Sequence, residues 1–467
     1  MAMTPFAPLP PETTAAAGRA WHEGPFILVL GIGKTGLSCA RYLRAQGASV
    51  AVADTRVQPP CLDALRAELP EVPVFLGGFT PEVFARATEF ILSPGVPLSE
   101  PLVQESLARG MPVRGDIALF AQAAQAPICA ITGSNGKSTV TTLVGEMAAR
   151  ALQRVAVGGN LGTPALDLLD PGVELYVLEL SSFQLETTEG LAPQAAAVLN
   201  LSPDHLDRYA SLDDYAQAKA RIYRDARVAI VNRDDPIVAA MPRAAEREIG
   251  FTLREPQGTD FGLRRSRGQI WLYQGERPLM PAAEVRLAGR HNLANALAAL
   301  ALADACSIPE AIACAVLREF AGLPHRCVLV AERQGVRWYD DSKGTNPGAT
   351  IAALEGLLPE DATGRVVLIA GGLAKGADFS PLRDPVRRAA RAVILIGQDA
   401  PLIAAALDGA APLVRAADLD EAVHLADTWA RPGDCVLLSP ACASFDMFAN
   451  YEHRGRAFAE AVLRLPT

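Results

Sequence analysis

Short apolar runs alternate with helix-forming segments along most of this chain, and small or polar residues follow many of the runs. A short apolar run bounded by glycine, proline or polar residues is typical of a buried strand, and strands that alternate with helices form parallel sheets. The pattern therefore predicts an α/β protein. The predicted strands are residues 26–30, 49–53, 90–92, 127–132, 155–157, 174–180, 195–199, 228–232, 336–339, 366–370, 393–396 and 435–438.

The order of these elements predicts three domains. A chain of 467 residues is long enough for about three domains of ~150 residues each. We expect boundaries near residues 115 and 322, and short alternating stretches over residues 250–285 predict antiparallel pairing there. The predicted units are a disordered tail (1–24), a half-Rossmann-like domain (25–115), a central parallel sheet (116–322) and a C-terminal Rossmann-like domain (323–467).

The strongest motif joins the predicted strand 127–132 to a helix predicted over residues 137–150. It reads Thr132-Gly133-Ser134-Asn135-Gly136-Lys137-Ser138-Thr139. Such a loop directs backbone N–H groups and the positive end of a helix dipole at one point, which suits phosphate oxygens. Lys137 would reach the outer phosphates of ATP, and the hydroxyl of Ser138 or Thr139 would hold Mg²⁺. The chain has Ile131 where the longer G-x-x-x-x-G-K-[ST] pattern has glycine, and the alternative is a glycine-rich turn with a surface lysine.

A second glycine-rich loop, residues 31–36, follows the first predicted strand. It satisfies G-x-G-x-x-G, and Asp54 follows the next strand, as in nucleotide sites. The turn Ser93-Pro94-Gly95 ends another predicted strand, and ligands of open α/β sheets collect at such strand ends. The pattern is short and common, so a loop needed only for packing remains the alternative. About 90 residues suffice for one mononucleotide-binding half rather than a full dinucleotide fold.

Three further residues of the central domain are candidates for metal chemistry. Glu179 ends a predicted strand and is the best second carboxylate ligand for Mg²⁺, with a structural strand-end acid as the alternative. His205 stands between Asp204 and Asp207 and could bind a second cation or orient a phosphate, although a lone histidine is more often structural. Lys219 lies in a helix that Ser211 caps. By itself it is most simply interpreted as a solvated charge on a helix face.

Polar loops also follow at least three predicted strands of the C-terminal domain. Arginine forks and lysine charges on such loops suit carboxylates and phosphates. Each residue alone could be a surface charge, and their placement on successive strand ends favours a ligand site. The candidates are Arg326, Lys343, Thr345, Lys375 and Ser444.

Composition limits the partners of the chain. The net charge of −9 does not favour nucleic-acid binding, and no apolar stretch is long enough to predict a membrane span. The first residues lack the apolar segment of a signal peptide. Eight scattered cysteines without a C-x-x-C pair predict neither a disulfide framework nor a zinc site, which fits a reducing cytoplasm.

Taken together, the motifs resemble the Mur ligases of peptidoglycan synthesis, from Phe26 onward. The resemblance depends on the order of many motifs over the chain, since any one alone would be weak. Its carriers are the phosphate loop 132–139, Leu178-Glu179-Leu180-Ser181-Ser182-Phe183-Gln184-Leu185, Asp204-His205-Leu206-Asp207-Arg208-Tyr209, Gly289-Arg290-His291-Asn292, Leu323-Pro324-His325-Arg326, Asp341-Ser342-Lys343-Gly344-Thr345-Asn346 and Ser439-Pro440-Ala441-Cys442-Ala443-Ser444.

The resemblance implies a reaction. ATP activates a substrate carboxylate as an acyl phosphate, and the amine of an amino acid attacks it. Within the family it implies the addition of D-glutamate to UDP-N-acetylmuramoyl-L-alanine by a monomer with two Mg²⁺ sites. It also implies that Lys219 is carbamylated, against the interpretation from the residue alone.

The resemblance assigns residues to each ligand. For ATP it implies Gly133, Asn135, Gly136, Lys137, Ser138, Thr139, Asn292, Arg326 and Asp341. For the metals it implies Ser138, Glu179, His205 and Lys219, with Lys137, His205 and Lys219 as catalytic residues. For the UDP-linked substrate and glutamate it implies Gly33, Thr35, Asp54, Thr55, Arg56, Ser93, Gly95, Asn160, Lys343, Thr345, Lys375, Ser444 and Tyr451, where Tyr451 replaces an expected phenylalanine.

Three alternatives remain open at this stage. Folylpolyglutamate synthase shares the phosphate loop and the addition of glutamate, but it would not need the first glycine loop for UDP. A nicotinamide-dependent oxidoreductase would use that loop instead. A regulatory ATP-binding module would bind the nucleotide without ligase chemistry.

Overall fold

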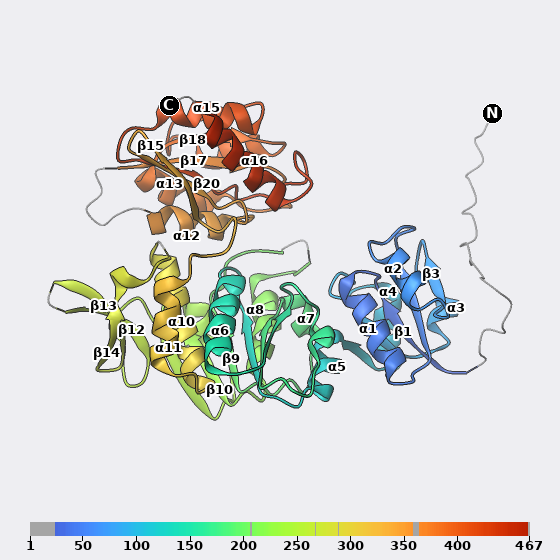
Figure 1. Cartoon of the computed structure of the whole chain (residues 1–467). Coiled ribbons are helices and arrows are strands. Elements are labelled where there is room, and N and C mark those ends of the chain that lie inside the picture. Colours follow the sequence, from blue (N-terminus) through green and yellow to red (C-terminus); the bar gives the residue numbers. More distant parts are fainter. Residues whose placement is uncertain (1–23, 206–207, 267, 288, 358–363, 466–467) are drawn as a thin grey trace, which may run out of the picture.

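The computed structural model describes residues 24–465 apart from residues 206–207, 267, 288 and 358–363. The tail predicted over residues 1–24 lies almost wholly outside the described residues, as do Leu206 and Asp207 of one motif. The described residues form three separate, mostly parallel sheets with helices packed on them (Figure 1). The predicted α/β class is therefore confirmed.

The first sheet contains five parallel strands in the order β3-β2-β1-β4-β5. β1 and β4 are neighbours, so the loops that follow them lie at one edge of the sheet. The strands are β1 (Phe26–Leu30), β2 (Val50–Asp54), β3 (Val74–Leu76), β4 (Ala87–Leu92) and β5 (Val113–Gly115). The helices are α1 (Lys34–Ala45), α2 (Leu62–Glu68), α3 (Pro81–Phe84) and α4 (Pro101–Ala108).

The central sheet has nine strands in the order β14-β13-β12-β11-β10-β9-β6-β8-β7. The antiparallel pairing predicted within residues 250–285 is confirmed, because β12 pairs antiparallel with β13, and β13 with β14. The strands are β6 (Ile128–Thr132), β7 (Val155–Gly159), β8 (Leu175–Glu179), β9 (Ala195–Val198), β10 (Val228–Asn232), β11 (Arg247–Phe251), β12 (Phe261–Ser266), β13 (Gln269–Gln274) and β14 (Arg277–Pro281). The helices are α5 (Asp116–Ala123), α6 (Lys137–Ala151), η1 (Ala165–Leu168), α7 (Ser182–Glu186), α8 (Leu212–Ala220), η2 (Arg221–Tyr223), α9 (Pro236–Ala240), η3 (Ala282–Glu284), α10 (Arg290–Ala305) and α11 (Glu310–Glu319).

The third sheet has six strands in the order β15-β16-β20-β17-β18-β19, and only β15 is antiparallel to its neighbour. The strands are β15 (Val328–Arg333), β16 (Val336–Asp340), β17 (Val366–Gly371), β18 (Ala390–Ile396), β19 (Leu413–Arg415) and β20 (Cys435–Leu438). The helices are α12 (Pro347–Leu357), η4 (Ser380–Leu382), α13 (Arg383–Ala389), α14 (Ala400–Leu407), α15 (Leu419–Trp429) and α16 (Tyr451–Arg464).

Strand β6 shows why the parallel strands are continuous apolar runs. Its side chains alternate between two cores: Cys129 and Ile131 pack in one cluster with α6 and α10, and Ile128 and Ala130 pack in another. A strand covered on both faces needs apolar side chains at every position. The second cluster also contains residues of the first sheet, so the first and central units share an apolar core.

The first and third units both pack against the central unit. The third unit lies over the end of the central sheet where α10 meets α12, and the first unit lies beside α5 (Figure 1). No helix among the described residues has both the length and the apolar character needed to cross a membrane.

Candidate active site

The predicted phosphate loop joins β6 to α6. Gly133 has φ +152° and Gly136 has φ +83°, conformations that favour glycine. A Cβ on Gly136 would lie 2.5 Å from Asn295 Oδ1, so this turn has no room for a larger residue. The chain therefore turns at Gly136, and α6 begins at Lys137. The N–H groups of its first turn face the loop.

Lys137 folds back over its own loop. Its Nζ donates to the carbonyl oxygens of Gly133 at 2.8 Å and Ser134 at 2.9 Å. Burial lowers the pKa of Lys137, while the nearby Glu179 carboxylate opposes the shift. The ammonium is thus held at the point where the loop would meet an anion.

Ser138 and Glu179 provide oxygen atoms side by side. Ser138 Oγ donates to Glu179 Oε2 at 2.6 Å, and Asn160 Nδ2 donates to Glu179 Oε1 at 2.6 Å. A hydroxyl and a carboxylate suit Mg²⁺, which commonly takes one or two protein oxygens together with water and phosphate oxygens. Among the described residues no three His, Cys, Asp or Glu side chains gather as a metal cluster. The donor set therefore fits a magnesium ion shared with a phosphorylated ligand.

Lys219 is buried, with only 1% of its surface exposed. Its interpretation as a solvated helix-face charge is therefore wrong: Nζ donates to Gly133 O at 2.9 Å and lies 3.4 Å from Thr132 Oγ1. The ammonium also lies 4.5 Å from the centre of the Tyr215 ring. Burial, followed by repulsion from Lys137, sets the pKa of Lys219 well below its usual value. A buried amine with a low pKa is neutral for more of the time, and a neutral amine is a nucleophile.

His205 lies at the rim of the same region. Its side chain is 45% exposed, and Nε2 is 3.8 Å from Asp204 Oδ2. Its ring centre is 4.8 Å from that of Phe183 and 6.2 Å from that of Tyr215. Tyr215 thus contacts both His205 and Lys219, which places the two predicted ligands of a second metal around one aromatic side chain.

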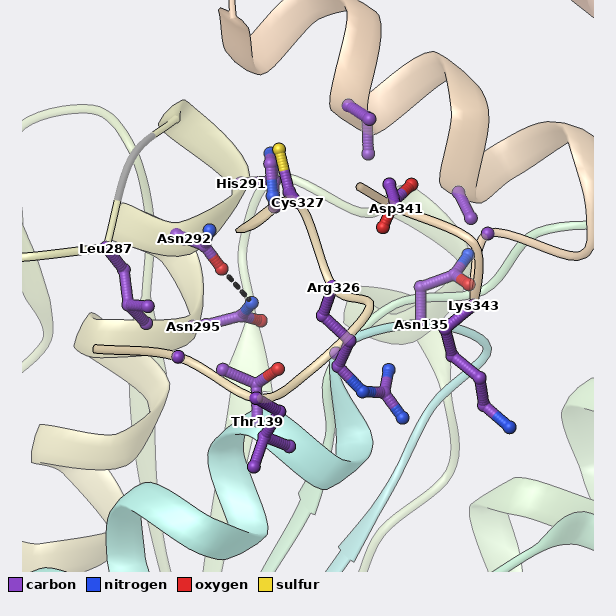
Figure 2. Close-up of a pocket in the computed structure, with 17 residues that line it drawn as sticks. Asn135, Thr139, Leu287, His291, Asn292, Asn295, Arg326, Cys327, Asp341 and Lys343 are labelled. Atoms are coloured by element: carbon purple, nitrogen blue, oxygen red, sulfur yellow. Dashed lines mark hydrogen bonds between the residues drawn. The ribbon is translucent and has the colours of Figure 1, made fainter. Parts of the chain in front are cut away.

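Six of the nine predicted ATP residues line a pocket between the central and third units (Figure 2). Asn295 Nδ2 donates to Asn292 Oδ1 at 3.0 Å, which fixes the Asn292 amide. Asp341 accepts a hydrogen bond from Ser439 Oγ at 2.7 Å, and burial raises its pKa to about 7. The lining includes Asn135, Gly136, Thr139, Asn292, Arg326 and Asp341 of the predicted set, together with His291, Asn295 and Cys327.

His291, Asn295 and Cys327 were not predicted as site residues. His291 and Asn295 lie in the first two turns of α10. A histidine or an asparagine in a helix does not by itself predict a ligand contact. No local sequence pattern marks Cys327 as a site residue. It lines the pocket because its neighbour in the chain, Arg326, lies there.

A second cavity of about 530 Å³ opens beside the first. Both the phosphate loop and the third unit contribute to its lining. Predicted residues in the lining are Asn135, Gly136, Lys137, Ser138, Asn160, Glu179, His205, Arg326, Lys343, Thr345, Lys375 and Tyr451. Ser444 is buried next to Ala443, which lines the cavity. Lys219 lies beneath the loop, where its Nζ contacts the carbonyl oxygen of Gly133, a loop residue.

Cations of the third unit face the phosphate loop across this cavity. Arg326 Nη2 donates to Ser138 Oγ at 2.7 Å, so two residues 188 positions apart meet at the predicted metal site. Lys343 Nζ lies 3.8 Å from the centre of the Tyr451 ring. Burial, then repulsion from Arg326, lowers the pKa of Lys343 to about 8. Lys375 has φ +50° and lies 5.3 Å from the Phe445 ring.

Amide side chains connect the same two units. Asn135 Nδ2 donates to Asn346 Oδ1 at 3.4 Å, and Asn346 Nδ2 donates to Asp204 Oδ2 at 3.0 Å. These hydrogen bonds fix the orientations of the Asn135 and Asn346 side-chain amides within one network. The phosphate loop and the segment of His205 are therefore joined to the loop that follows β16.

The predicted residues of the first unit lie at the carboxyl ends of β1, β2 and β4. Ser93 Oγ donates to Gly31 O at 2.9 Å. Asp54 accepts from the Ile32 amide at 2.7 Å and from three nitrogen atoms of Arg56, its amide and two of its guanidinium. Burial alone would raise the pKa of Asp54, but these hydrogen bonds hold it below its usual value. Gly33, Thr35, Thr55 and Gly95 flank these contacts and are partly or fully exposed.

Comparison with known proteins identifies the three units. Three family models match: Mur ligase MurD-like, N-terminal domain over residues 25–115; Mur ligase middle domain over 131–303; and Mur ligase, glutamate ligase domain over 325–442. A UDP-N-acetylmuramoylalanine–D-glutamate ligase of Nitrosococcus oceani is 53% identical over 97% of this chain and 98% of its own length. One of Pseudomonas putida is 55% identical over 93% of this chain and 97% of its own.

Solved structures share the fold at low sequence identity. MurF from Acinetobacter baumannii has a TM-score of 0.59 at 20% identity, over 95% of this chain and 92% of its own. A pseudomurein peptide ligase type C from Methanothermus fervidus has a TM-score of 0.58 at 17% identity, over 89% of this chain and 96% of its own. These likenesses support the three-unit arrangement of the sheets.

Proposed function

This chain belongs to the Mur ligase family, and we propose that it joins D-glutamate to UDP-N-acetylmuramoyl-L-alanine with ATP, in the synthesis of peptidoglycan precursors. Relatives with this activity in their names are 53–55% identical over more than nine-tenths of the chain. The observation that carries the proposal is the cavity in which the phosphate loop, Glu179 and the cations of the third unit face one another.

The reaction has two steps. The alanyl carboxylate attacks the γ-phosphorus of ATP, which forms an acyl phosphate and releases ADP. The amine of D-glutamate then attacks the acyl carbon, an amide bond forms, and inorganic phosphate leaves as the amine loses its proton. The first step transfers a negatively charged phosphoryl group and the second expels phosphate from the acyl carbon, so positioned cations and N–H donors supply most of the catalysis.

Lys137 and the loop amides bind the outer phosphates in this proposal. Lys137 exchanges its two carbonyl acceptors for phosphate oxygens, a charge-assisted contact. Arg326 reaches the same place from the third unit through Ser138. Asn292 and Asp341 line the neighbouring pocket, which would take the nucleoside.

Ser138 and Glu179 would hold one Mg²⁺, and His205 with a modified Lys219 would hold a second. Bound there, magnesium neutralises charge on the phosphoryl oxygens. Asn160 keeps Glu179 turned toward Ser138 through the hydrogen bond to its other oxygen. His205 would bind through a ring nitrogen, which must be unprotonated to do so.

Lys219 would carry a carbamate. Its neutral amine attacks CO₂, an N–C bond forms, and one proton leaves to solvent, which leaves an anionic oxygen ligand. The burial that lowers the pKa of Lys219 favours the neutral amine needed for this step. The carbamate would also remove the repulsion between Lys219 and Lys137.

The remaining predicted residues divide between the two other substrates. Lys343, Thr345, Lys375, Ser444 and Tyr451 would surround D-glutamate and the transferred phosphate. Residues of the first unit, including Asp54 and Ser93, would hold the UDP end, with Asn160 on the central unit. The units would then be residues 25–115 for the UDP-linked substrate, 116–322 for ATP and 323–467 for glutamate.

We also propose a monomer that works in the cytoplasm. All eight cysteines are free thiols, which suits a reducing compartment.

Phosphate release measured with ATP, UDP-N-acetylmuramoyl-L-alanine and D-glutamate tests the function. We expect release only when all three are present, and little release with L-glutamate. Release with a folate and L-glutamate would support the folylpolyglutamate alternative. Binding of a nicotinamide cofactor with hydride transfer would support the oxidoreductase, and ATP binding without any release would support a regulatory module.

The low pKa of Lys343 predicts a pH-dependent affinity for ATP. Anion binding favours the protonated amine, so the Kd for ATP should stay constant below about pH 8 and rise above it, up to about tenfold per pH unit. Calorimetric titration of ATP from pH 6.5 to 9.5 measures this. In Lys343→Arg the guanidinium stays charged, so the same titration should lose most of the rise. Equal slopes in both proteins would show that another group controls the affinity.

A further inference from the structure

Arg208 reaches from the central unit into the first unit. Its Nη1 donates to the carbonyl oxygen of Pro94 at 2.7 Å, and its Nη2 lies 3.4 Å from that of Val96. The side chain is 15% exposed. A largely buried guanidinium therefore caps the turn that follows β4, although it lies more than 110 positions further along the chain.

On the central unit, two contacts hold the same guanidinium and one holds the backbone of Arg208. Nη2 bonds to Glu186 Oε2 at 3.1 Å, and that carboxylate is only 14% exposed. The guanidinium carbon lies 4.0 Å from the centre of the Phe183 ring. The Arg208 amide donates to the carbonyl of His205 at 2.9 Å. Arg208 is thus held by α7 on one side and by the segment of His205 on the other.

The turn that Arg208 caps supports the first glycine loop. Ser93 Oγ donates to Gly31 O, and the Ser93 amide donates to Leu30 O at 2.9 Å. The Val96 amide donates to Ser93 O at 2.9 Å, which closes the turn. A shift of the turn would therefore move Gly31 and the loop that starts α1.

We propose that Arg208 is a positioning residue for the UDP-linked substrate. It holds the turn of residues 93–96 against the central unit, so that the loop for the UDP end and the His205 segment keep one fixed separation. This inference rests on the proposed function, because it needs a substrate that spans the first and central units. Arg208 acts through the turn and does not itself react.

The contacts require arginine rather than lysine. One planar group must donate to a carbonyl oxygen and a carboxylate while its face lies on an aromatic ring. A lysine ammonium keeps the charge but cannot present a flat face and two separated donors. Arg208→Lys is therefore a conservative variant that separates charge from geometry.

Calorimetry with the full chain tests the inference without turnover. UDP-N-acetylmuramoyl-L-alanine and ATP are titrated separately into wild type, Arg208→Ala, Arg208→Lys and Glu186→Gln. We expect the Kd for the UDP-linked substrate to rise at least about tenfold in Arg208→Ala, the size expected when charge-assisted hydrogen bonds are lost. The Kd for ATP should change less than about twofold, since the Arg208 side chain lines neither the pocket for the nucleoside nor the large cavity. Arg208→Lys and Glu186→Gln should give smaller rises in the same direction.

Arg41→Ala is the matched control. Arg41 on α1 also joins the first and central units, through Nη2 and Asp167 Oδ2 at 2.9 Å, but it does not contact the 93–96 turn. If simple loosening of the two units were responsible, Arg41→Ala would raise the Kd for the UDP-linked substrate as much as Arg208→Ala does. Thermal unfolding of each variant shows whether the fold is kept.

The outcomes separate this inference from the proposed function. Wild type that neither binds the UDP-linked substrate nor releases phosphate with D-glutamate would refute the function itself. A functional wild type with an unchanged Kd in Arg208→Ala would refute only the role of Arg208. Parallel rises in both Kd values would also refute it, since they would indicate general damage. If Arg208→Ala does not fold, the Kd values of Arg208→Lys and Glu186→Gln decide: no selective rise in either overturns the inference.

Discussion

Lys137→Ala is expected to reduce kcat by at least about 10³-fold, the lower range for losing a cation that stabilises phosphoryl transfer. Lys137 is the lysine of the phosphate loop, and the other cations at the cavity come from the third unit. The cations of the third unit are placed to meet other ligand oxygens, so they do not replace Lys137. Phosphate release at saturating ATP measures the loss.

Arg150→Ala on the same helix is the control for Lys137→Ala. Arg150 lies in the last turn of α6 and pairs with Glu319 at 2.8 Å on the surface. An exposed pair contributes at most about 1 kcal/mol to stability, so this variant should keep wild-type kcat. Wild-type turnover in Lys137→Ala would show that the loop does not bind the outer phosphates.

Lys219→Ala should lose at least about 10²-fold in kcat, because two carbamate oxygens would leave the second metal site together. The loss should be larger than that for an exposed lysine, since Lys219 is buried against Gly133 O. A small carboxylic acid could supply the missing oxygen ligands. Millimolar acetate or formate should therefore restore part of the activity of Lys219→Ala.

Two controls test this rescue. Acetate should not rescue Lys137→Ala, where a cation rather than an oxygen ligand is missing. Gln217→Ala changes an exposed residue on the same helix and should leave kcat unchanged. Near-wild-type turnover by Lys219→Ala without additive would remove both the carbamate and the second metal from the mechanism.

Local pattern was enough to predict the elements that carry the site. β1 was predicted at its observed residues, and the phosphate loop was predicted from its glycines, because both depend on neighbours in the sequence. The three-residue strands β3, β5 and β19 were missed, since so short a run shows no periodicity.

Contacts across the units could not be predicted from local pattern. Arg326 meets Ser138 because two sheets are packed together, and no spacing rule connects residues 188 positions apart. Lys219 shows the same limit: its helix has a mixed pattern, and only the packed structure shows that its amine lies under the phosphate loop.

A compositional signal could have found Lys219. The chain has 43 lysine and arginine residues, but only five are lysines. Their positions are Lys34, Lys137, Lys219, Lys343 and Lys375. Three of the five line the large cavity, and Lys219 lies beneath its loop. Where nearly all basic residues of a chain are arginines, a lysine indicates a site where the smaller cation or its neutral amine is needed.

The cations at the large cavity are divided between two units, and this division affects when bound ATP can react. Lys137 belongs to the central unit, whereas Arg326 and Lys343 belong to the third. A unit that held all of them could hydrolyse ATP with water whenever the nucleotide bound. Here the full set of charges exists only while the two units are apposed, as they are where Arg326 meets Ser138. Separation of the units would take Arg326 and Lys343 away from the phosphate loop and leave Lys137 as the cation of the central unit beside it.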